Sequence, residues 1–189
     1  MKHHTTFLLS AVLTMAVAMT ASAVEYKAIQ AEKSKVTFQY KQMGVTMEGH
    51  FKKFAAQLNF DPAKPAAAKA DFDIDLASID AGSSDADDEV VSKTWFNVKA
   101  FPKATFVAKQ IKATGANQFD VTGVLTIKGK SQDVNFPLKL IAQGSTAVFS
   151  GGFIMRRADF AIGEGLWAKF DVVANDIQVN FQLTAISGK

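Results

Sequence analysis

Strict alternation of apolar and polar residues constrains the fold of this chain more than any other feature. The clearest run lies near the C-terminus, where apolar residues occupy positions 177, 179, 181 and 183 and amides fill the positions between them. The same pattern recurs at 36–40, 45–51, 56–60, 72–76, 119–127 and 134–140. A two-residue period places alternate side chains on opposite faces of a strand. The sequence therefore predicts an antiparallel β-structure with one face in water.

One segment breaks the alternation and predicts a short helix. Ser83 or Ser84 can cap a helix whose first turn carries the acidic residues of 85–89, a favourable charge at a helix N-terminus. Apolar residues at 90, 91, 95 and 96 would then form its buried stripe. We expect this helix to lie against one end of the sheet.

The turn signals between these runs favour a single all-β domain. About eight strands joined by short turns, with one helix, fit a closed barrel or a sandwich. Pro137 lies inside a predicted strand and indicates an edge or a bulge. An exposed edge near Pro137 would permit a homodimer.

The N-terminal 23 residues have the pattern of a cleaved secretory signal. Lys2 precedes an apolar stretch from Phe7 to Met19, and Ala21-Ser22-Ala23 is a small-x-small cleavage site. We therefore expect residues 1–23 to be removed and residues 24–189 to form one domain in the periplasm.

Composition narrows the possible functions. Cysteine is absent, so disulfides, thiolate metal sites and cysteine nucleophiles are excluded. The net charge of +3 is small and scattered, which argues against nucleic acid as a partner. Phenylalanine occurs 16 times against 2 tyrosines and 2 tryptophans, so the interior should be dry. Such an interior fits a filled core and a cavity for a hydrocarbon ligand equally well.

Few residues suggest chemistry. His50 is the single histidine after the predicted signal, so no histidine-rich metal site is expected, and no serine has the surroundings of a nucleophile elbow. We therefore expect that the protein is not an enzyme and that it uses no catalytic cofactor. Arg156, Arg157 and Asp159 end an apolar strand. They form either a structural pair at a barrel rim or, since guanidinium binds polar oxygens, a headgroup contact at a cavity mouth.

Several segments together resemble the YceI-like family of periplasmic, lipocalin-like polyisoprenoid-binding proteins. The resemblance spans the whole predicted mature chain, and its order and spacing are more specific than any one piece. The resemblance rests on the segments Ser34–Phe38, Gly49–Phe51 with Phe54, Asp71–Asp75 with Ser78–Asp80, Trp95–Val98, Phe101–Phe106, Val121–Gly129 and Arg157–Phe160.

The resemblance implies an antiparallel eight-stranded lipocalin-like barrel with one short helix capping an end. Its cavity would hold an isoprenoid quinone or another long-chain polyisoprenoid lipid, and the protein would act as a carrier in transient contact with a membrane. The alternative is a redox partner that presents quinone to a membrane b-type cytochrome. A third hypothesis, an enzyme acting at the barrel mouth through His50, Glu164 or Asp159, has little support.

The expected cavity residues combine inward strand positions with aromatic residues near the helix and the loop around 163–167. Small Gly49 and Gly123 lie between them and are expected to leave room. The expected set is Phe38, Val45, Met47, Phe72, Ile74, Trp95, Phe96, Phe106, Leu125, Phe136, Met155, Trp167 and Phe170.

Overall fold

The computed structural model describes residues 24–188, so the predicted signal at 1–23 lies outside the described residues. No helix within the described part is long and apolar enough to cross a membrane. The strands are β1 (Tyr26–Ile29), β2 (Lys35–Gln42), β3 (Val45–Phe51), β4 (Phe54–Asn59), β5 (Lys69–Asp75), β6 (Ile79–Asp80), β7 (Lys103–Gly115), β8 (Gln118–Ile127), β9 (Lys130–Gln143), β10 (Thr146–Arg156) and β11 (Asp176–Ser187). The α-helix is α1 (Ser84–Val90), and the short 3₁₀ turns are η1 (Ala31–Lys33), η2 (Pro65–Ala67), η3 (Leu76–Ser78), η4 (Arg157–Phe160) and η5 (Gly165–Trp167).

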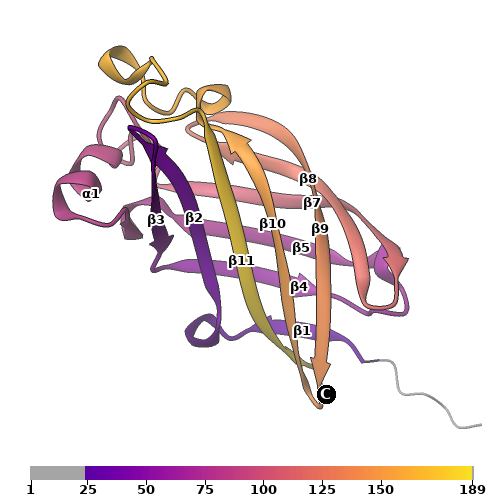
Figure 1. Cartoon of the computed structure of the whole chain (residues 1–189). Coiled ribbons are helices and arrows are strands. Elements are labelled where there is room, and N and C mark those ends of the chain that lie inside the picture. The colour runs from indigo at the N-terminus through magenta and orange to yellow at the C-terminus, as the bar shows by residue number, and fades with distance from the viewer. Residues whose placement is uncertain (1–23, 189) are drawn as a thin grey trace, which may run out of the picture.

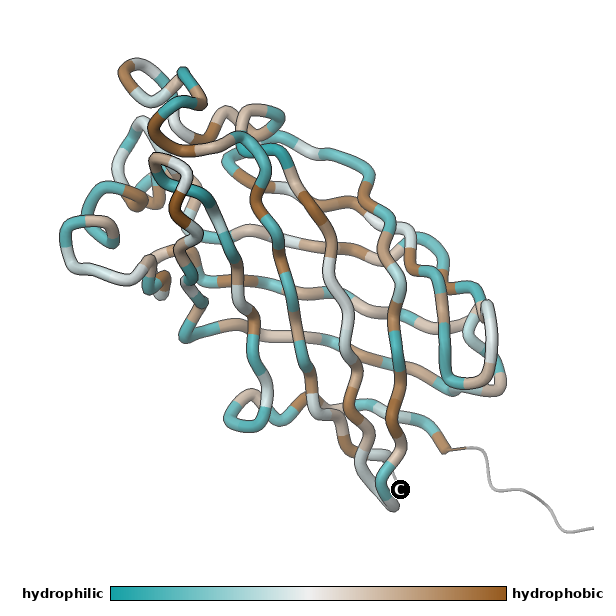
Figure 2. Tube along the Cα trace, in the orientation of Figure 1, coloured by the Kyte–Doolittle hydropathy of each residue, from teal (hydrophilic) through white to brown (hydrophobic). Residues whose placement is uncertain are grey.

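All of the strands belong to one antiparallel sheet, as the alternation predicts, and this sheet curls into the barrel-like shape that the resemblance implies. The strand order is β4-β5-β7-β8-β9-β10-β11-β2-β3-β6, and β1 pairs with β11. Strands β2, β10 and β11 run steeply across β4, β5 and β7 (Figure 1). Brown and teal residues alternate along the strands (Figure 2), so one face of the sheet can be apolar while the other meets water.

Short strands lie at both ends of this sheet: β1 links the β4 end to β11, and β6 is the outermost strand at the other end. Tyr26 exchanges backbone hydrogen bonds with Phe60, just after β4, at 2.8 and 3.0 Å, while β1 also pairs with β11. At the other end of the sheet, β6 pairs with His50 and Phe51 of β3. These short strands account for most of the excess over the eight predicted, because two to four residues give too little alternation to detect.

The end of the barrel beside β1 is a filled aromatic core. Phe60 lies edge-on to Phe119 and to Phe149, with ring centroids 5.1 and 5.2 Å apart, and Tyr26 meets Phe149 at 5.8 Å. All four side chains are almost fully buried. Edge-to-face pairs at such distances add to the stability given by area burial alone. These rings therefore fill the interior at this end.

The predicted helix is present but shorter than expected. Its N-cap is Ser83, whose hydroxyl accepts a hydrogen bond from the Ala86 N–H at 3.3 Å. The helix ends at Val90, and a series of turns follows in which the Ser92 carbonyl accepts hydrogen bonds from the N–H groups of Trp95 and Asn97. The prediction that Trp95 belongs to the helical stripe is therefore wrong, because the chain reverses before reaching it.

Pro137 lies where the pairing of β9 with β10 ends. It is opposite Asp120 of β8, and the β9–β10 ladder runs only as far as Leu138 and Gly151. Residues 130–136 of β9 thus pair with β8 alone. A residue without an N–H fits this boundary, so the predicted edge exists locally, although β9 lies inside the sheet.

Candidate functional site

A cavity of about 570 Å³ occupies the half of the barrel opposite the filled core. Its volume lies within the usual range of small-molecule sites, about 300–1,000 Å³. A band of phenylalanine rings from different strands forms one part of the wall. The centroid of the Phe136 ring of β9 lies 5.5 Å from that of Phe106 of β7, 5.5 Å from that of Phe153 of β10 and 5.4 Å from that of Phe181 of β11.

Most of the predicted cavity residues lie in this wall. They are Phe38, Met47, Phe72, Ile74, Trp95, Phe96, Phe106, Leu125, Phe136, Met155 and Trp167. Two others lie elsewhere. Val45 begins β3 and is 61% exposed, and Phe170 is half exposed and packs on Arg157. Alternation predicts that the Val45 side chain points inward, but at the start of β3 it meets solvent instead.

The two small glycines do not enlarge the cavity, contrary to expectation. The space in which a Gly49 Cβ would lie is filled by the Phe38 ring and the Asp80 carbonyl oxygen. The same space at Gly123 is filled by the Phe106 ring and the Val107 carbonyl oxygen. Each glycine therefore lets the outer end of a phenylalanine ring approach the backbone closely.

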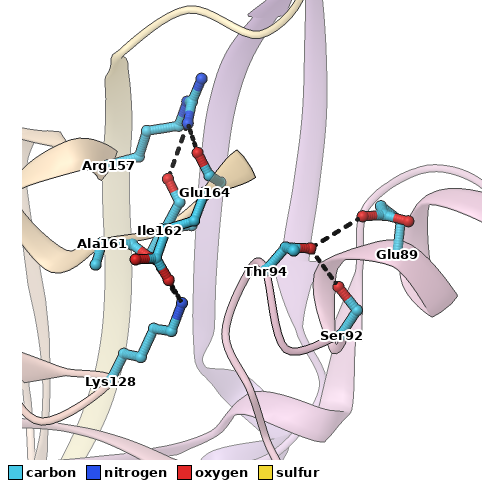
Figure 3. Close-up of polar contacts among 9 residues, drawn as sticks. Glu89, Ser92, Thr94, Lys128, Arg157, Ala161, Ile162 and Glu164 are labelled. Carbon is cyan, nitrogen blue, oxygen red and sulfur yellow. Dashed lines mark hydrogen bonds and ion pairs between the residues drawn. The ribbon is translucent and has the colours of Figure 1, made fainter. Parts of the chain in front are cut away.

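Trp95 and Trp167 close one end of the cavity. Their rings meet at 5.5 Å with an interplanar angle of 61°. The two segments that carry them are joined through the backbone, because the Thr94 carbonyl accepts hydrogen bonds from Gly163 and Glu164 at 2.9 and 2.8 Å. Thr94 Oγ1 also contacts Glu89 of α1 at 3.4 Å (Figure 3). The turn after α1 and the loop after β10 thus form one wall.

Arg157 anchors this wall from inside the protein. Its side chain is only 1% exposed, and its guanidinium lies 5.4 Å from the Trp95 ring and 5.0 Å from the Phe170 ring. All of its nitrogens donate hydrogen bonds to backbone carbonyls of the loop that follows η4, at 2.7–3.2 Å. The acceptors are Ile162, Gly163, Trp167, Lys169, Val173 and Ala174. Burial lowers the pKa of Arg157 from its ordinary value.

The structure separates the three residues that were predicted as a mouth contact. Arg157 lies in the cavity wall, but its donors are already used by carbonyls. Arg156 and Asp159 instead form an exposed pair outside the wall, with Arg156 Nε and Nη2 both 3.0 Å from Asp159 Oδ2. Such a pair contributes about 0–1 kcal/mol to stability. The geometry therefore matches the structural alternative more closely than the headgroup contact.

Lys128 and Glu164 form an ion pair that holds the loop after η4, and the sequence does not predict it. Lys128 Nζ donates to Glu164 Oε2 and to the Ala161 carbonyl, each at 2.7 Å (Figure 3). The Lys128 side chain is 8% exposed, and its hydrogen bond holds the pKa of Glu164 below its ordinary value. Neither this pair nor the carbonyl cage of Arg157 has a sequence signature, because the partners are distant residues or backbone atoms.

The ionisable groups of the cavity wall are few. Besides Arg157 they are Asp85 and Glu89 of α1 and the phenol of Tyr40, which donates to the Ala81 carbonyl at 2.9 Å. Burial, helped by the charge of Asp87, raises the pKa of Tyr40. Within residues 24–188 no group of three or more His, Cys, Asp or Glu side chains could hold a metal ion. His50 is exposed on the outer face of β3, as expected.

The chain is similar to known proteins over most of its length. A model of the YceI-like domain matches residues 27–185. A UPF0312 protein from Azotobacter vinelandii is 32% identical over 164 residues, which cover 83% of this chain and 84% of the relative.

Two solved structures show the same fold. The crystal structure of BcnA from Burkholderia cenocepacia is 44% identical, with a TM-score of 0.81, and the match covers 83% of this chain and 99% of BcnA. A polyisoprenoid binding domain from Saccharophagus degradans has a TM-score of 0.70 at 16% identity, covering 88% of this chain and all of that domain. The fold and these matches agree, and the chain belongs to the YceI-like family.

Proposed function

We propose that this protein binds one long-chain isoprenoid lipid with an uncharged polar end, such as an isoprenoid quinone, and carries it through the periplasm. The observation that carries this proposal is the apolar cavity of about 570 Å³ in one half of an otherwise filled barrel. The polyisoprenoid binding domain from Saccharophagus degradans, which shares the fold, supports a ligand of this class. The signal-like residues 1–23 support the compartment.

The chemistry of the wall fits an isoprenoid tail. Burial of one CH₂ group contributes about 0.8 kcal/mol, so each five-carbon unit offers up to about 4 kcal/mol before ordering costs. Phenylalanine rings and Met47 and Met155 line the cavity. Methionine side chains adapt to irregular apolar shapes, which suits a branched tail. No catalytic step is required for this function.

The charges of the wall favour an uncharged polar end over a phosphate. A phosphate bound in a dry site needs unused cationic donors. The guanidinium of Arg157 has none to offer, because the loop carbonyls already accept from every nitrogen. Asp85 and Glu89 of α1 would repel an anion. The Trp95 indole N–H is buried without an acceptor among residues 24–188, so a neutral ligand oxygen is the better complement.

Fluorescence offers a direct test, because both tryptophans of the chain lie in the cavity wall. A quinone with an isoprenoid tail should quench them saturably, with a stoichiometry of one. Met47→Arg places a charge in the apolar wall and should weaken this binding about tenfold or more. Thr46→Arg is the matched control, since Thr46 is exposed on the opposite face of β3. Absence of saturable quenching, or equal loss in both variants, would contradict the proposal.

A further inference from the structure

Exposed apolar side chains gather on two neighbouring loops at the cavity end of the molecule. Met43 and Val45 lie at the turn between β2 and β3, and they are 71% and 61% exposed. Leu166, Phe170 and Val172 lie in the loop between η4 and β11, and Leu166 is 98% exposed. We call these five side chains the apolar rim. Half of the large apolar side chains that are exposed in residues 24–188 belong to it.

Backbone hydrogen bonds fix the two loops of the rim side by side. The Met43 N–H donates to the Val172 carbonyl at 2.7 Å, and the Ala174 N–H donates to the Lys41 carbonyl at 2.9 Å. Figure 1 shows the β2–β3 turn and the loop before β11 at the same end of the barrel. The rim is therefore one surface made of two protruding loops, and the anchors described for Arg157 and Lys128 hold its second loop in place.

The rim is continuous with the cavity wall. Gln42 and Met47 flank the first loop segment and line the cavity, and Trp167 and Val173 do the same from the second loop. Side chains that point outward from these loops thus lie beside side chains that line the cavity.

Charges around the rim suit a phospholipid surface. Lys41, near the end of β2, and Lys169, in the second loop, are both exposed. Of the acidic residues there, Glu164 is paired with Lys128 at 2.7 Å, and Asp171 accepts a hydrogen bond from the Val172 N–H at 3.0 Å. Exposed apolar side chains with flanking lysines are the pattern of proteins that dip side chains into a membrane interface.

We propose that the apolar rim is a membrane-contact surface, which inserts shallowly into a phospholipid bilayer so that the cavity can exchange its lipid. The role in lipid exchange rests on the proposed function, whereas contact with a membrane can be tested without it. A convex rim on two loop tips offers no groove for a protein segment, whereas a fluid bilayer accommodates it. Large apolar patches on a protein surface commonly mark such contacts.

The test is co-flotation of the protein with vesicles of phosphatidylcholine and phosphatidylglycerol that contain no isoprenoid. The double variant Met43→Asn/Leu166→Asn removes the two most exposed rim side chains. Asn suits position 43, where φ is +48°. The double variant Val107→Asn/Ile154→Asn is the matched control, because it removes two exposed apolar side chains that belong to strands β7 and β10 and not to the loops of the rim.

Wild type and control should float with the vesicles, and the rim variant should lose about tenfold or more of its partitioning. Equal flotation of the rim variant, or no flotation of the wild type, would overturn the inference. Quinone quenching in vesicle-free solution should be unchanged in the rim variant. If the wild type binds quinone but does not float with vesicles, the membrane-contact proposal is wrong and the proposed function stands. If it floats but does not bind quinone, the proposed function is wrong and the membrane contact stands.

Discussion

Arg157 illustrates how a single charged residue can be buried without an acidic partner. Six carbonyl dipoles converge on its guanidinium, and two aromatic rings cover its faces. Charge-assisted hydrogen bonds of this kind contribute about 1.5–3 kcal/mol each when formed. A guanidinium presents five N–H groups on a planar fork, whereas an ammonium group presents three around a single atom.

Arg157→Lys should therefore destabilise the protein even though the charge is conserved. Three donors on one ammonium cannot reach six carbonyls, so we expect the free energy of unfolding to fall by about 3 kcal/mol or more. Arg156→Lys is the control and should cost about 1 kcal/mol or less, because its pair with Asp159 is exposed. Urea unfolding of both variants provides the measurement, and equal losses would contradict the role assigned to Arg157.

Glu164 should make the same loop sensitive to acid. Its hydrogen bond from Lys128, aided by the positive charge, lowers its pKa in the folded protein below the ordinary value of 4.5. A carboxyl with a lowered pKa stabilises the fold fully above its unfolded pKa, and this contribution is lost as the pH falls through the folded pKa.

We therefore expect the stability difference between wild type and Glu164→Gln to be constant near neutral pH and to shrink as the pH falls below about 4.5. Thermal unfolding across this range measures the difference. In a Lys128→Met background, Glu164→Gln should show no such pH dependence. If the dependence persists there, the pair with Lys128 is not its cause.

At the scale of elements, α1 combines a capped N-terminus with a role in the cavity wall. Glu89 lines the cavity, whereas Asp88, the preceding residue, is exposed and lies outside the wall. The two positions carry the same charge on the same helix. They therefore separate a local effect on the ligand from a general change in net charge.

Glu89→Lys should raise the affinity for a polyprenyl phosphate about tenfold, because a cation replaces a carboxylate beside the polar end of the ligand. Asp88→Lys should change this affinity by less than about threefold, since solvent and salt screen an exposed charge. Competition between a polyprenyl phosphate and a quinone of equal tail length measures both. A wild type that prefers the phosphate would show that the wall accepts anions after all.

The elements also show which parts of the structure the sequence predicts. Alternation predicts β2, β3, β4, β5, β8, β9 and β11 and many positions of the cavity wall, and Ser83 is one of the two predicted helix caps, because these features depend on neighbours in the chain. The turn that removes Trp95 from α1 and the carbonyl cage of Arg157 depend on contacts between distant segments. The small size of Gly49 predicts free space in the cavity, but the Phe38 ring of the adjacent strand fills that space.

At the scale of the whole molecule, the barrel is half filled and half hollow. Phe60, Phe119 and Phe149 pack edge to face at one end, whereas Phe136 and Phe181 line the cavity toward the other. Composition favoured neither a filled core nor a cavity, because a dry phenylalanine-rich interior suits both. The outcome depends on whether rings from opposite strands meet, and periodicity along a single strand contains no information about that.

If the hollow half holds an isoprenoid lipid, mass spectrometry of an organic extract of the protein will detect that lipid. The protein would be purified without detergent from the cells that naturally produce it, together with a control protein of the same compartment. We expect an isoprenoid lipid with an uncharged polar end, near one molecule per protein. An extract with no lipid above the level of the control would contradict it.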